Sequence, residues 1–355
     1  MRRAFAVLTL LSITHAADFR LARPGYHYRF PADHFNHPDF QTEWWYYTGN
    51  VQTKAGHRYG FELVFFRLGQ SQTAPGDAAG RSAWRADNLY LADLALTDID
   101  GRRFQSWQRL NRAGPGIAGA SLETARVWNG NWRAVWDTAT NVQSLSAIAD
   151  GIRLELRCAP RKPPVIHGEN GVSQTGDGAG EAAYYVSFTR LAVVGTINQQ
   201  AVSGIAWMDH EWFTTLLDRE QRGWDWFSVQ LDDSTELMLF ELRRNDGGID
   251  AHSSGTFVDA GGRTTPLRRG DFELRPLAYW TSAKTHARYP VKWHISIPSR
   301  HLEMDCAAAL PDQELTAETV GPAYWEGAVT YAGGANGIGY LEMTGYAEAL
   351  RMYGR

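Results

Sequence analysis

Apolar side chains recur at every second position along much of the chain, which is the spacing of a β-strand. Tyr59, Phe61, Leu63 and Phe65 fall in this way on one face of a single segment. The dipeptide Asn129-Gly130 lies between two tryptophan-containing segments and is a strong signal for a two-residue hairpin. Turn signals recur at intervals of about ten to fifteen residues. The pattern therefore predicts an antiparallel all-β protein and not a series of βαβ units.

The same pattern extends over both halves of the chain. Further predicted strands are residues 89–95, 132–136, 152–158, 184–191, 202–208, 224–231, 236–244, 255–259, 291–297, 325–331 and 339–348. The segments 43–67 and 224–243 each contain a Trp-rich strand followed by an apolar strand that ends in Arg, which indicates a weak internal duplication. Residues 209–220 are the best candidate for a short helix. Two consecutive antiparallel barrels or curved sheets fit these features, because closing a barrel removes exposed strand edges.

The first 16 residues have the features of a secretory signal peptide. A basic start, Met1-Arg2-Arg3, precedes an apolar run and the small-residue end Thr14-His15-Ala16. The apolar run is about ten residues long, too short to span a bilayer. We expect cleavage near Ala16 and a mature protein that is periplasmic or secreted; the alternative is an apolar N-terminal helix of the fold. No later stretch has the length and apolarity of a membrane span, so none is predicted.

Aromatic residues are abundant, with 14 Trp, 15 Tyr and 15 Phe in 355 residues. This much bulky apolar surface has to be buried, which excludes a disordered protein, and the length fits two domains of ordinary size. Tryptophan is difficult to bury completely because its N–H needs a partner. The excess of Trp therefore favours apolar walls with polar rims, as in a ligand cavity.

Charge and cysteine content exclude further classes of function. Loss of Arg2 and Arg3 would change the formal net charge from −4 to −6, and without a basic run nucleic-acid binding has no electrostatic support. Cys158 and Cys306 form either a disulfide between the halves or two buried thiols. G-x-S-x-G, H-E-x-x-H, a phosphate-binding loop and metal-type Cys/His spacings do not occur. We therefore expect no metal and no cofactor. We also expect a monomer.

The strongest candidate for catalysis is the segment 207–212, at the junction of the two halves. In an extended strand, His210 and Trp212 project to one side and Asp209 and Glu211 to the other. A histidine beside an indole and carboxylates can act as an acid or base near neutral pH. The alternative is a structural junction in which the histidine and the indole only pack.

Other polar and aromatic residues on apolar segments are candidates for ligand binding. Carboxylates that face a barrel interior would have raised pKa values, and the long Pro/Gly-rich loop 160–180 could cover a cavity. The candidate ligand-binding residues are Glu43, Trp44, Trp45, Tyr46, Arg67, Asp93, His167, Tyr185, Trp224, Asp225, Trp226, Tyr324, Trp325 and Glu326. Arg67 would pair with a buried acid. Any single one of the carboxylates could instead face water or satisfy a structural hydrogen bond.

Several sequence blocks resemble those of a known superfamily. The blocks are EWWYYTGN (43–50), the strand 60–67, PVIHGENG (164–171), the tyrosine pair 184–185, WMDHEW (207–212) and YWEGAV (324–329). Together they resemble the AttH/carotenoid 1,2-hydratase superfamily, and the resemblance runs from about residue 39 to residue 346. It implies an all-β fold of two consecutive lipocalin-like antiparallel β-barrel domains, which we expect at residues 17–205 and 206–355.

The resemblance implies more than one function. Carotenoid hydratases of the superfamily add water to a double bond, and their His-x-Trp pair matches His210 and Trp212. Secreted bacterial members, which this chain resembles, are often encoded beside ABC-type export components, and this implies a possible partner. One hypothesis is a hydratase or hydrolase that binds a hydrophobic, isoprenoid- or lipid-like molecule. The alternatives are a non-catalytic periplasmic carrier of lipids or amphiphiles and a glycoside hydrolase with paired carboxylates.

Overall fold

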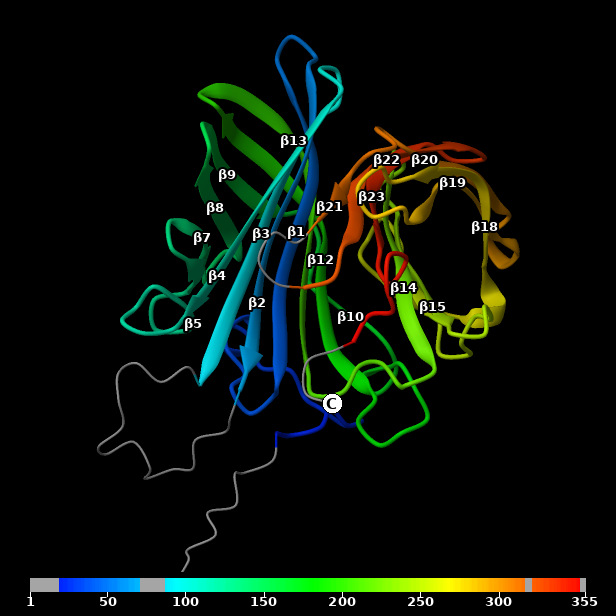
Figure 1. Ribbon diagram of the computed structural model, residues 1–355, viewed down its shortest axis with the longest axis horizontal. Coiled ribbons are helices and arrows are strands. Elements are labelled where there is room, and N and C mark those ends of the chain that lie inside the picture. The colour runs from blue at the N-terminus through cyan, green and yellow to red at the C-terminus, as the bar shows by residue number, and fades with distance from the viewer. Residues whose placement is uncertain (1–18, 71–86, 317–320, 352–355) are drawn as a thin grey trace, which may run out of the picture.

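The computed structural model describes residues 19–70, 87–316 and 321–351. These residues form two large, curled antiparallel sheets that stand side by side (Figure 1). The prediction of an all-β, lipocalin-like fold is confirmed. The predicted signal peptide lies outside the described residues.

The first sheet is built from the N-terminal part of the chain. Its strands are β1 (Thr42–Thr53), β2 (Arg58–Gly69), β3 (Asn88–Asp98), β4 (Arg103–Arg112), β5 (Ala118–Ser121), β6 (Arg126–Asn129), β7 (Trp132–Asp137), β8 (Val142–Ala149), β9 (Ile152–Pro160), β10 (Val165–Ile166), β11 (Ser173–Gln174), β12 (Ala182–Ile197) and β13 (Gln200–Phe213). Their spatial order is β4-β3-β2-β1-β13-β12-β9-β8-β7-β6-β5, and the short β10 and β11 pair with β12. The first strand of the chain thus pairs with the last strand of the sheet.

The second sheet contains the remaining strands. They are β14 (Gln221–Leu231), β15 (Glu236–Arg244), β16 (Ser254–Val258), β17 (Thr264–Arg268), β18 (Glu273–Thr281), β19 (Arg288–Ile297), β20 (Leu302–Ala308), β21 (Glu314–Leu315), β22 (Tyr324–Gly333) and β23 (Gly337–Met343). The order is β17-β16-β15-β14-β23-β22-β20-β19-β18, with β21 beside β22. Both sheets therefore place a meander of four strands beside the final strand of the sheet. This shared connectivity agrees with the internal duplication that the two Trp-rich segments indicate.

Helical structure in the described residues is confined to three single turns of 3₁₀ helix, at Ala32–His34, Arg269–Asp271 and Pro298–Arg300. The helix predicted at 209–220 is wrong. Residues 209–213 complete β13, because that strand hydrogen-bonds to β1 on one side and to β12 on the other. The expected domain boundary at 205/206 thus falls inside β13, and the chain passes to the second sheet through residues 214–220. Within the described part of the chain, no helix has the length and apolarity needed to cross a membrane.

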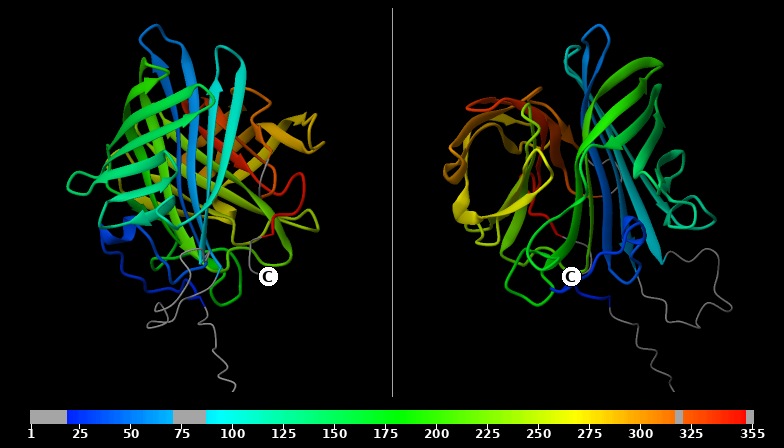
Figure 2. Two further views of the ribbon diagram at one scale, coloured as in Figure 1. Left: turned by 60° about the vertical axis from the view of Figure 1, so that its left-hand side comes forward. Right: turned by 180° about the vertical axis from the view of Figure 1, so that it is seen from behind.

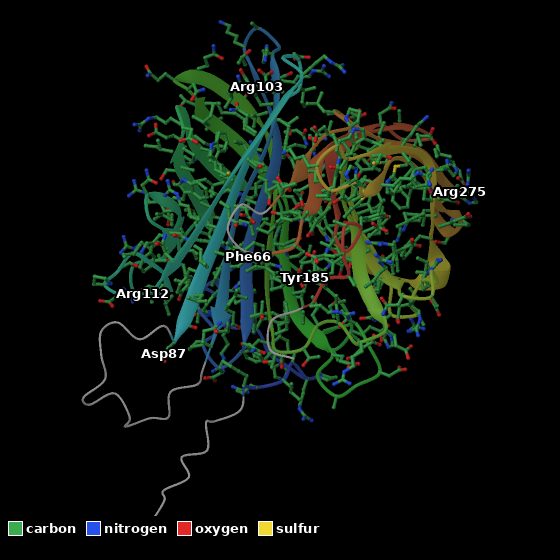
Figure 3. All side chains as sticks on the ribbon, in the orientation of Figure 1. Phe66, Asp87, Arg103, Arg112, Tyr185 and Arg275 are labelled. Carbon is green, nitrogen blue, oxygen red and sulfur yellow. The ribbon has the colours of Figure 1, made fainter. Side chains whose placement is uncertain are left out.

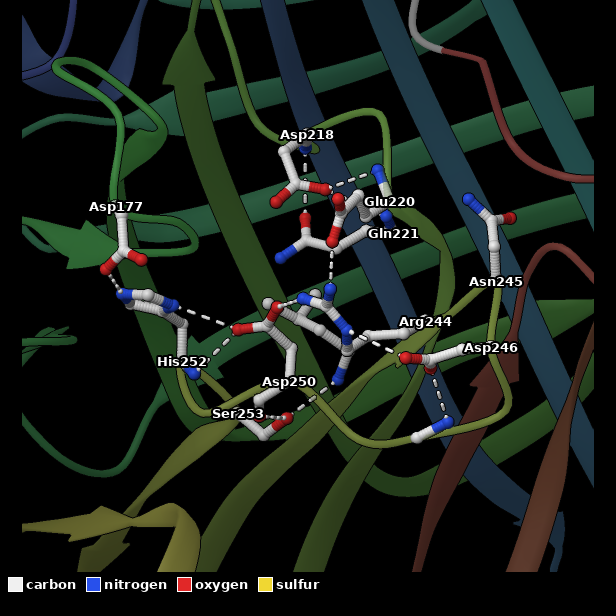
Figure 4. A network of polar contacts seen from close by, with 12 residues as sticks. Asp177, Asp218, Glu220, Gln221, Arg244, Asn245, Asp246, Asp250, His252 and Ser253 are labelled. Atoms are coloured by element: carbon white, nitrogen blue, oxygen red, sulfur yellow. Dashed lines mark hydrogen bonds and ion pairs between the residues drawn. The ribbon is translucent and has the colours of Figure 1, made fainter.

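A polar network holds this connection against the second sheet (Figure 4). Arg244, the last residue of β15, forms ion pairs with Glu220 and, at 3.0 Å, with Asp250. Within the connection, the backbone N–H of Gln221 donates to Asp218 Oδ1 at 2.8 Å. The entry into β14 is therefore fixed by side chains and not only by the strand ladder.

Each curled sheet encloses its own apolar core. The first core includes Trp45, Tyr47 and Cys158, and the second includes Trp325 and Cys306. Both cysteines are buried free thiols. Because they lie in different cores, the two-thiol alternative holds and the disulfide does not form.

A third apolar cluster lies between the sheets, where the convex face of one meets the other (Figure 2). Buried polar contacts also cross this interface. Glu236 of β15 accepts from Lys162 at 2.6 Å and from Arg190 at 2.5 Å. The Gln230 side-chain amide donates to backbone carbonyls of the first sheet at 2.8 and 3.0 Å. The two barrels are thus joined by a packed and hydrogen-bonded interface.

Candidate functional site

A cavity of about 180 Å³ lies between the two barrels. Aromatic and aliphatic side chains from both sheets form most of its wall. The apolar and aromatic lining residues are Trp44, Tyr46, Val64, Phe66, Leu68, Leu91, Tyr185, Leu216, Trp224, Trp226, Phe240, Leu242, Pro322, Tyr324 and Leu350. Figure 3 labels Phe66 and Tyr185, which lie in the region where the two barrels meet. We call this space the interbarrel cavity.

Among the described residues, four carboxyl groups line the interbarrel cavity: Asp93, Asp209, Glu211 and Glu342. They reach it because alternate residues of β3, β13 and β23 face the neighbouring barrel. The carboxyls stand in a wall that is otherwise largely apolar. A buried polar group in such a wall needs hydrogen bonds to avoid a large desolvation penalty.

Tryptophan indoles supply many of these hydrogen bonds. Trp207 Nε1 donates to Asp209 Oδ1 at 2.6 Å, and Trp44 Nε1 donates to Glu211 Oε1 at 3.1 Å. The indole of Trp224 hydrogen-bonds to Glu342. Several of the many tryptophans therefore form hydrogen bonds that hold carboxyl groups inside an apolar cavity.

The carboxyls of the cavity hold their protons more tightly than carboxyls in water do. Burial raises the pKa of Asp209 to about 7 and that of Glu342 to about 7. Burial, together with the charge of Asp209, raises the pKa of Glu211 well above its usual range. Burial also raises the pKa of Asp93 to about 6. Near neutral pH the cavity therefore contains carboxylic acids that can donate a proton.

Asp209 receives the densest set of contacts. Tyr185 Oη donates to Asp209 Oδ2 at 2.7 Å and accepts from Trp226 Nε1 at 3.0 Å. The Ser187 hydroxyl donates to Asp209 Oδ1. These contacts fix the carboxyl in one orientation toward the cavity.

Behind Ser187, a histidine continues the hydrogen-bond chain to the second barrel. His167 Nε2 lies 2.7 Å from Ser187 Oγ, and its Nδ1 lies 2.8 Å from Thr256 Oγ1. Burial lowers the pKa of His167 to about 3, so the ring is neutral. Because Ser187 donates to Asp209, it accepts from His167 Nε2, and Thr256 then donates to Nδ1. The loop histidine thus supports Asp209 from behind and does not line the cavity.

A second group of buried acids adjoins the cavity. Tyr324 Oη lies 3.0 Å from Glu62 Oε1 and 3.1 Å from Asp93 Oδ2. Tyr46 Oη donates to Glu326 Oε1 at 2.6 Å. Burial raises the pKa values of Glu62 and Glu326 well above the usual range, and the charge of Asp93 adds to the effect on Glu62. Two tyrosines of the wall therefore connect the cavity to further protonated carboxyls.

His210 and Trp212 lie on the opposite face of β13. They are not among the described residues that line the interbarrel cavity. His210 Nε2 lies 2.9 Å from Glu43 Oε1, and the Trp212 indole stacks on the ring of His37. Burial lowers the pKa of His210, although the hydrogen bond to Glu43 opposes this effect. Glu43, and not Asp209 or Glu211, therefore orients the His210 ring.

Glu43 is the centre of a buried ionic group in the first barrel. His37 Nδ1 lies 2.7 Å from Glu43 Oε1, and Arg67 Nε donates to Oε2 at 3.0 Å. The pairing of Arg67 with a buried acid is thus confirmed. Burial acts to raise the pKa of Glu43, but the charge of His37 and the hydrogen bonds of the two histidines outweigh it and hold the pKa well below its usual range. His37, Glu43 and His210 are also the described residues whose donor atoms are close enough together to hold a metal ion.

The candidate residues of the sequence thus fall into two groups. Those that line the interbarrel cavity are Trp44, Tyr46, Asp93, Tyr185, Asp209, Glu211, Trp224, Trp226 and Tyr324. Those that lie elsewhere are Glu43, Trp45, Arg67, His167, His210, Trp212, Asp225, Trp325 and Glu326. Asp225 lies in the second barrel, 2.9 Å from Arg243, because its neighbours Trp224 and Trp226 take the cavity side of the strand.

Sequence reasoning missed Glu342 and Glu62. Each has the signal that singled out Asp93, a carboxylate on an otherwise apolar strand. His37 was missed because it precedes the strand by several residues, in a segment without periodicity.

The fold and the cavity define a class of all-β protein: two lipocalin-like barrels with an apolar, carboxyl-lined cavity between them. The chain belongs to the AttH-like family, whose model matches residues 21–346.

Solved structures support this assignment. A crystal structure of a protein from Nitrosomonas europaea assigned as AttH has 34% sequence identity and a TM-score of 0.82, covering 94% of this chain and 100% of that one. Kievitone hydratase from Nectria haematococca has 15% identity and a TM-score of 0.68, covering 94% and 98% of the two chains. At that identity, the likeness to the hydratase concerns the fold. A search of curated protein sequences finds no significant match.

Proposed function

We propose that this protein is an exported hydratase-like enzyme that binds a hydrophobic molecule in the interbarrel cavity. The observation that carries the proposal is the placement of protonatable carboxyls, above all Asp209, in a largely apolar wall. An isolated alkene is a weak base, so its hydration needs a carboxylic acid that stays protonated near neutral pH. The fold agrees with the proposal, because kievitone hydratase is built in the same way.

In the proposed reaction, the Asp209 acid transfers its proton to one alkene carbon and the π bond breaks. The faces of Trp44, Trp224 and Trp226 in the cavity wall stabilise the resulting cation. Water then bonds to the other carbon and returns a proton to the carboxylate. One water molecule is added in total, and the acid is restored.

The test is turnover of a panel of apolar alkenes, including isoprenoids and prenylated aromatics, in ¹⁸O-labelled water. We expect a product heavier by one labelled water, formed more slowly above pH 7 because Asp209 then loses its proton. Asp209→Asn should lower turnover at least 100-fold. Glu241→Gln is the matched control, because burial also raises the pKa of Glu241 to about 7 but its side chain lies outside the cavity wall. Equal activity of Asp209→Asn and the wild type would refute the role of Asp209.

The apolar wall also favours a second candidate, a non-catalytic carrier of a lipid or amphiphile that works with an ABC-type transport system. Native mass spectrometry of the protein, purified from the periplasm of its native host, distinguishes the carrier from the enzyme. A co-purified apolar molecule that incubation leaves unchanged, with no hydrated product from any alkene, would favour the carrier. The largely apolar lining gives a glycoside hydrolase less support.

A further inference from the structure

Away from the interbarrel cavity, the first barrel holds a second group of convergent side chains. His37 lies before β1, Glu43 is on β1 and His210 is on β13. We propose that these three residues form a binding site for one divalent transition-metal ion of the zinc class. We call this group the His37–Glu43–His210 site.

The donor atoms converge on a single point. His37 Nδ1 and His210 Nε2 lie 2.7 and 2.9 Å from the same oxygen, Glu43 Oε1. All three donor atoms lie within 4.8 Å of one another. Zinc takes its nitrogen and oxygen ligands at about 2.0–2.2 Å, so the two imidazoles would move slightly away from Oε1 to admit an ion between them. An ion would lie between Oε1 and these two nitrogens, and each imidazole would present a lone pair to it.

The outer nitrogens of the two imidazoles are also oriented. His210 Nδ1 lies 3.1 Å from the carbonyl oxygen of Asp33, and His37 Nε2 lies 3.5 Å from the Asp33 carboxylate. Histidine ligands of metals typically donate their second N–H to a carbonyl or carboxylate, which fixes the tautomer and strengthens the ligand. One residue, Asp33, provides both kinds of partner here.

Aromatic stacking holds both rings in place before any ion binds. The Trp212 indole stacks on His37 with ring centroids 3.8 Å apart and planes within 2°. Trp45 stacks on His210 at 4.9 Å with an interplanar angle of 17°. A site with fixed ligand orientations loses little conformational entropy when the ion binds.

The charges and the donor types also suit such an ion. Arg67 and the His37 amide occupy Glu43 Oε2, which leaves Oε1 to face the two imidazoles. Metal binding requires both imidazoles to be unprotonated. In that form, the carboxylates of Asp33 and Glu43 and the Arg67 guanidinium leave one net negative charge for the ion to neutralise. Two imidazoles and one carboxylate favour zinc, iron(II), cobalt or nickel over calcium or magnesium.

The test uses the full chain, freed of metal with a chelator and titrated with Zn²⁺ by calorimetry. We expect one ion per chain, and at least tenfold weaker binding in Glu43→Gln, His37→Ala and Asp33→Asn. His294→Ala is the matched control, because His294 also contacts two carboxylates, Glu303 and Asp305, but at the surface. Its affinity should equal that of the wild type. No bound ion, or binding that only His294→Ala removes, would overturn the proposal.

A second measurement is independent of how well the variants fold. Crystals of the wild-type protein are soaked in Zn²⁺, diffraction data are collected at the zinc absorption edge, and an anomalous difference map is calculated. A peak bounded by His37 Nδ1, Glu43 Oε1 and His210 Nε2 supports the site. An empty site, with zinc only at surface histidines, contradicts it.

Discussion

At the residue scale, the pKa values of the buried carboxyls are shifted in two opposite directions. Asp209 and Glu342 receive indole or hydroxyl donors in an apolar wall, and burial dominates their pKa values. Glu43 receives an arginine and two histidines, and these partners outweigh burial. The same side-chain chemistry thus gives a proton donor in the interbarrel cavity and a permanent anion inside the first barrel.

Replacement of Arg67 by Met should destabilise the protein by about 3–5 kcal/mol, because the fully buried Glu43 carboxylate loses its guanidinium partner. Urea denaturation followed by tryptophan fluorescence measures the effect. Arg153→Met is the control, because the Arg153–Glu155 pair is exposed and should contribute less than about 1 kcal/mol. Equal stability of the two variants would show that Glu43 does not depend on Arg67.

The stability of the protein should fall as the pH rises from 5 to 8. Burial raises the pKa of Asp209 from its ordinary value of 3.8 to about 7 in the folded protein. Between these two pH values, the folded state therefore holds a proton that the unfolded chain has released. The stability from this proton is complete below about pH 4 and is lost as the pH rises through 7. Melting temperatures measured across this range should fall by several degrees.

Asp209→Asn should make this decline smaller, because its amide does not titrate. Asp312→Asn, a substitution of an exposed residue, should leave the wild-type profile unchanged. If the profile of Asp209→Asn matched that of the wild type, Asp209 would not be the titrating group.

At the scale of the elements, β13 is the strand that contributes residues both to the interbarrel cavity and to the His37–Glu43–His210 site. It lies between β1 and β12, and its two faces serve different sites. Asp209 and Glu211 face the interbarrel cavity, while His210 and Trp212 face the first barrel. Strict alternation makes this separation unavoidable, because successive side chains of a strand point to opposite sides.

The pairing of β13 with β1 requires a glycine at position 204. A Cβ atom there would lie 2.1 Å from the carbonyl oxygen of Asn50 on β1. Gly204→Ala should therefore force the strands apart and destabilise the protein by about 1–3 kcal/mol, as overpacking does. Thermal unfolding measures this change.

Gly270→Ala is the control for Gly204→Ala, because a Cβ at position 270 meets nothing within 4 Å. Its melting temperature should stay close to that of the wild type. A Gly204→Ala protein as stable as Gly270→Ala would mean that the β1–β13 pair can separate without loss.

At the scale of the whole molecule, the two barrels form one unit through a buried interface. The ion pairs of Glu236 with Lys162 and Arg190 join β15 to the first barrel, and all three side chains are largely buried. The interbarrel cavity exists only because both barrels contribute its wall. Its geometry therefore depends on how firmly the barrels are joined.

Glu236→Ala should weaken this joint, because it leaves two buried cations without their carboxylate. We expect a loss of about 3–5 kcal/mol and a change from one unfolding transition to two, as the barrels unfold separately. Far-UV circular dichroism and tryptophan fluorescence, recorded along one urea titration, should then no longer coincide. Glu155→Ala, at an exposed pair in one barrel, should keep a single transition. A single, unshifted transition in Glu236→Ala would contradict the coupling.

The sequence by itself determined many of the strands, the two-barrel class and the side chains that share a face, because alternation is a local property of an extended chain. Strands such as β4, β8, β18 and β20 were not predicted. It also placed carboxylates such as Asp93 on apolar strands. It gave no signal for His37, and it could not choose between the two faces of β13. That choice depends on which sheet covers which face, and only the tertiary structure decided it. The packing of the second barrel turned Asp209 and Glu211 toward the cavity and left His210 with Glu43 and His37, 167 and 173 positions earlier in the chain.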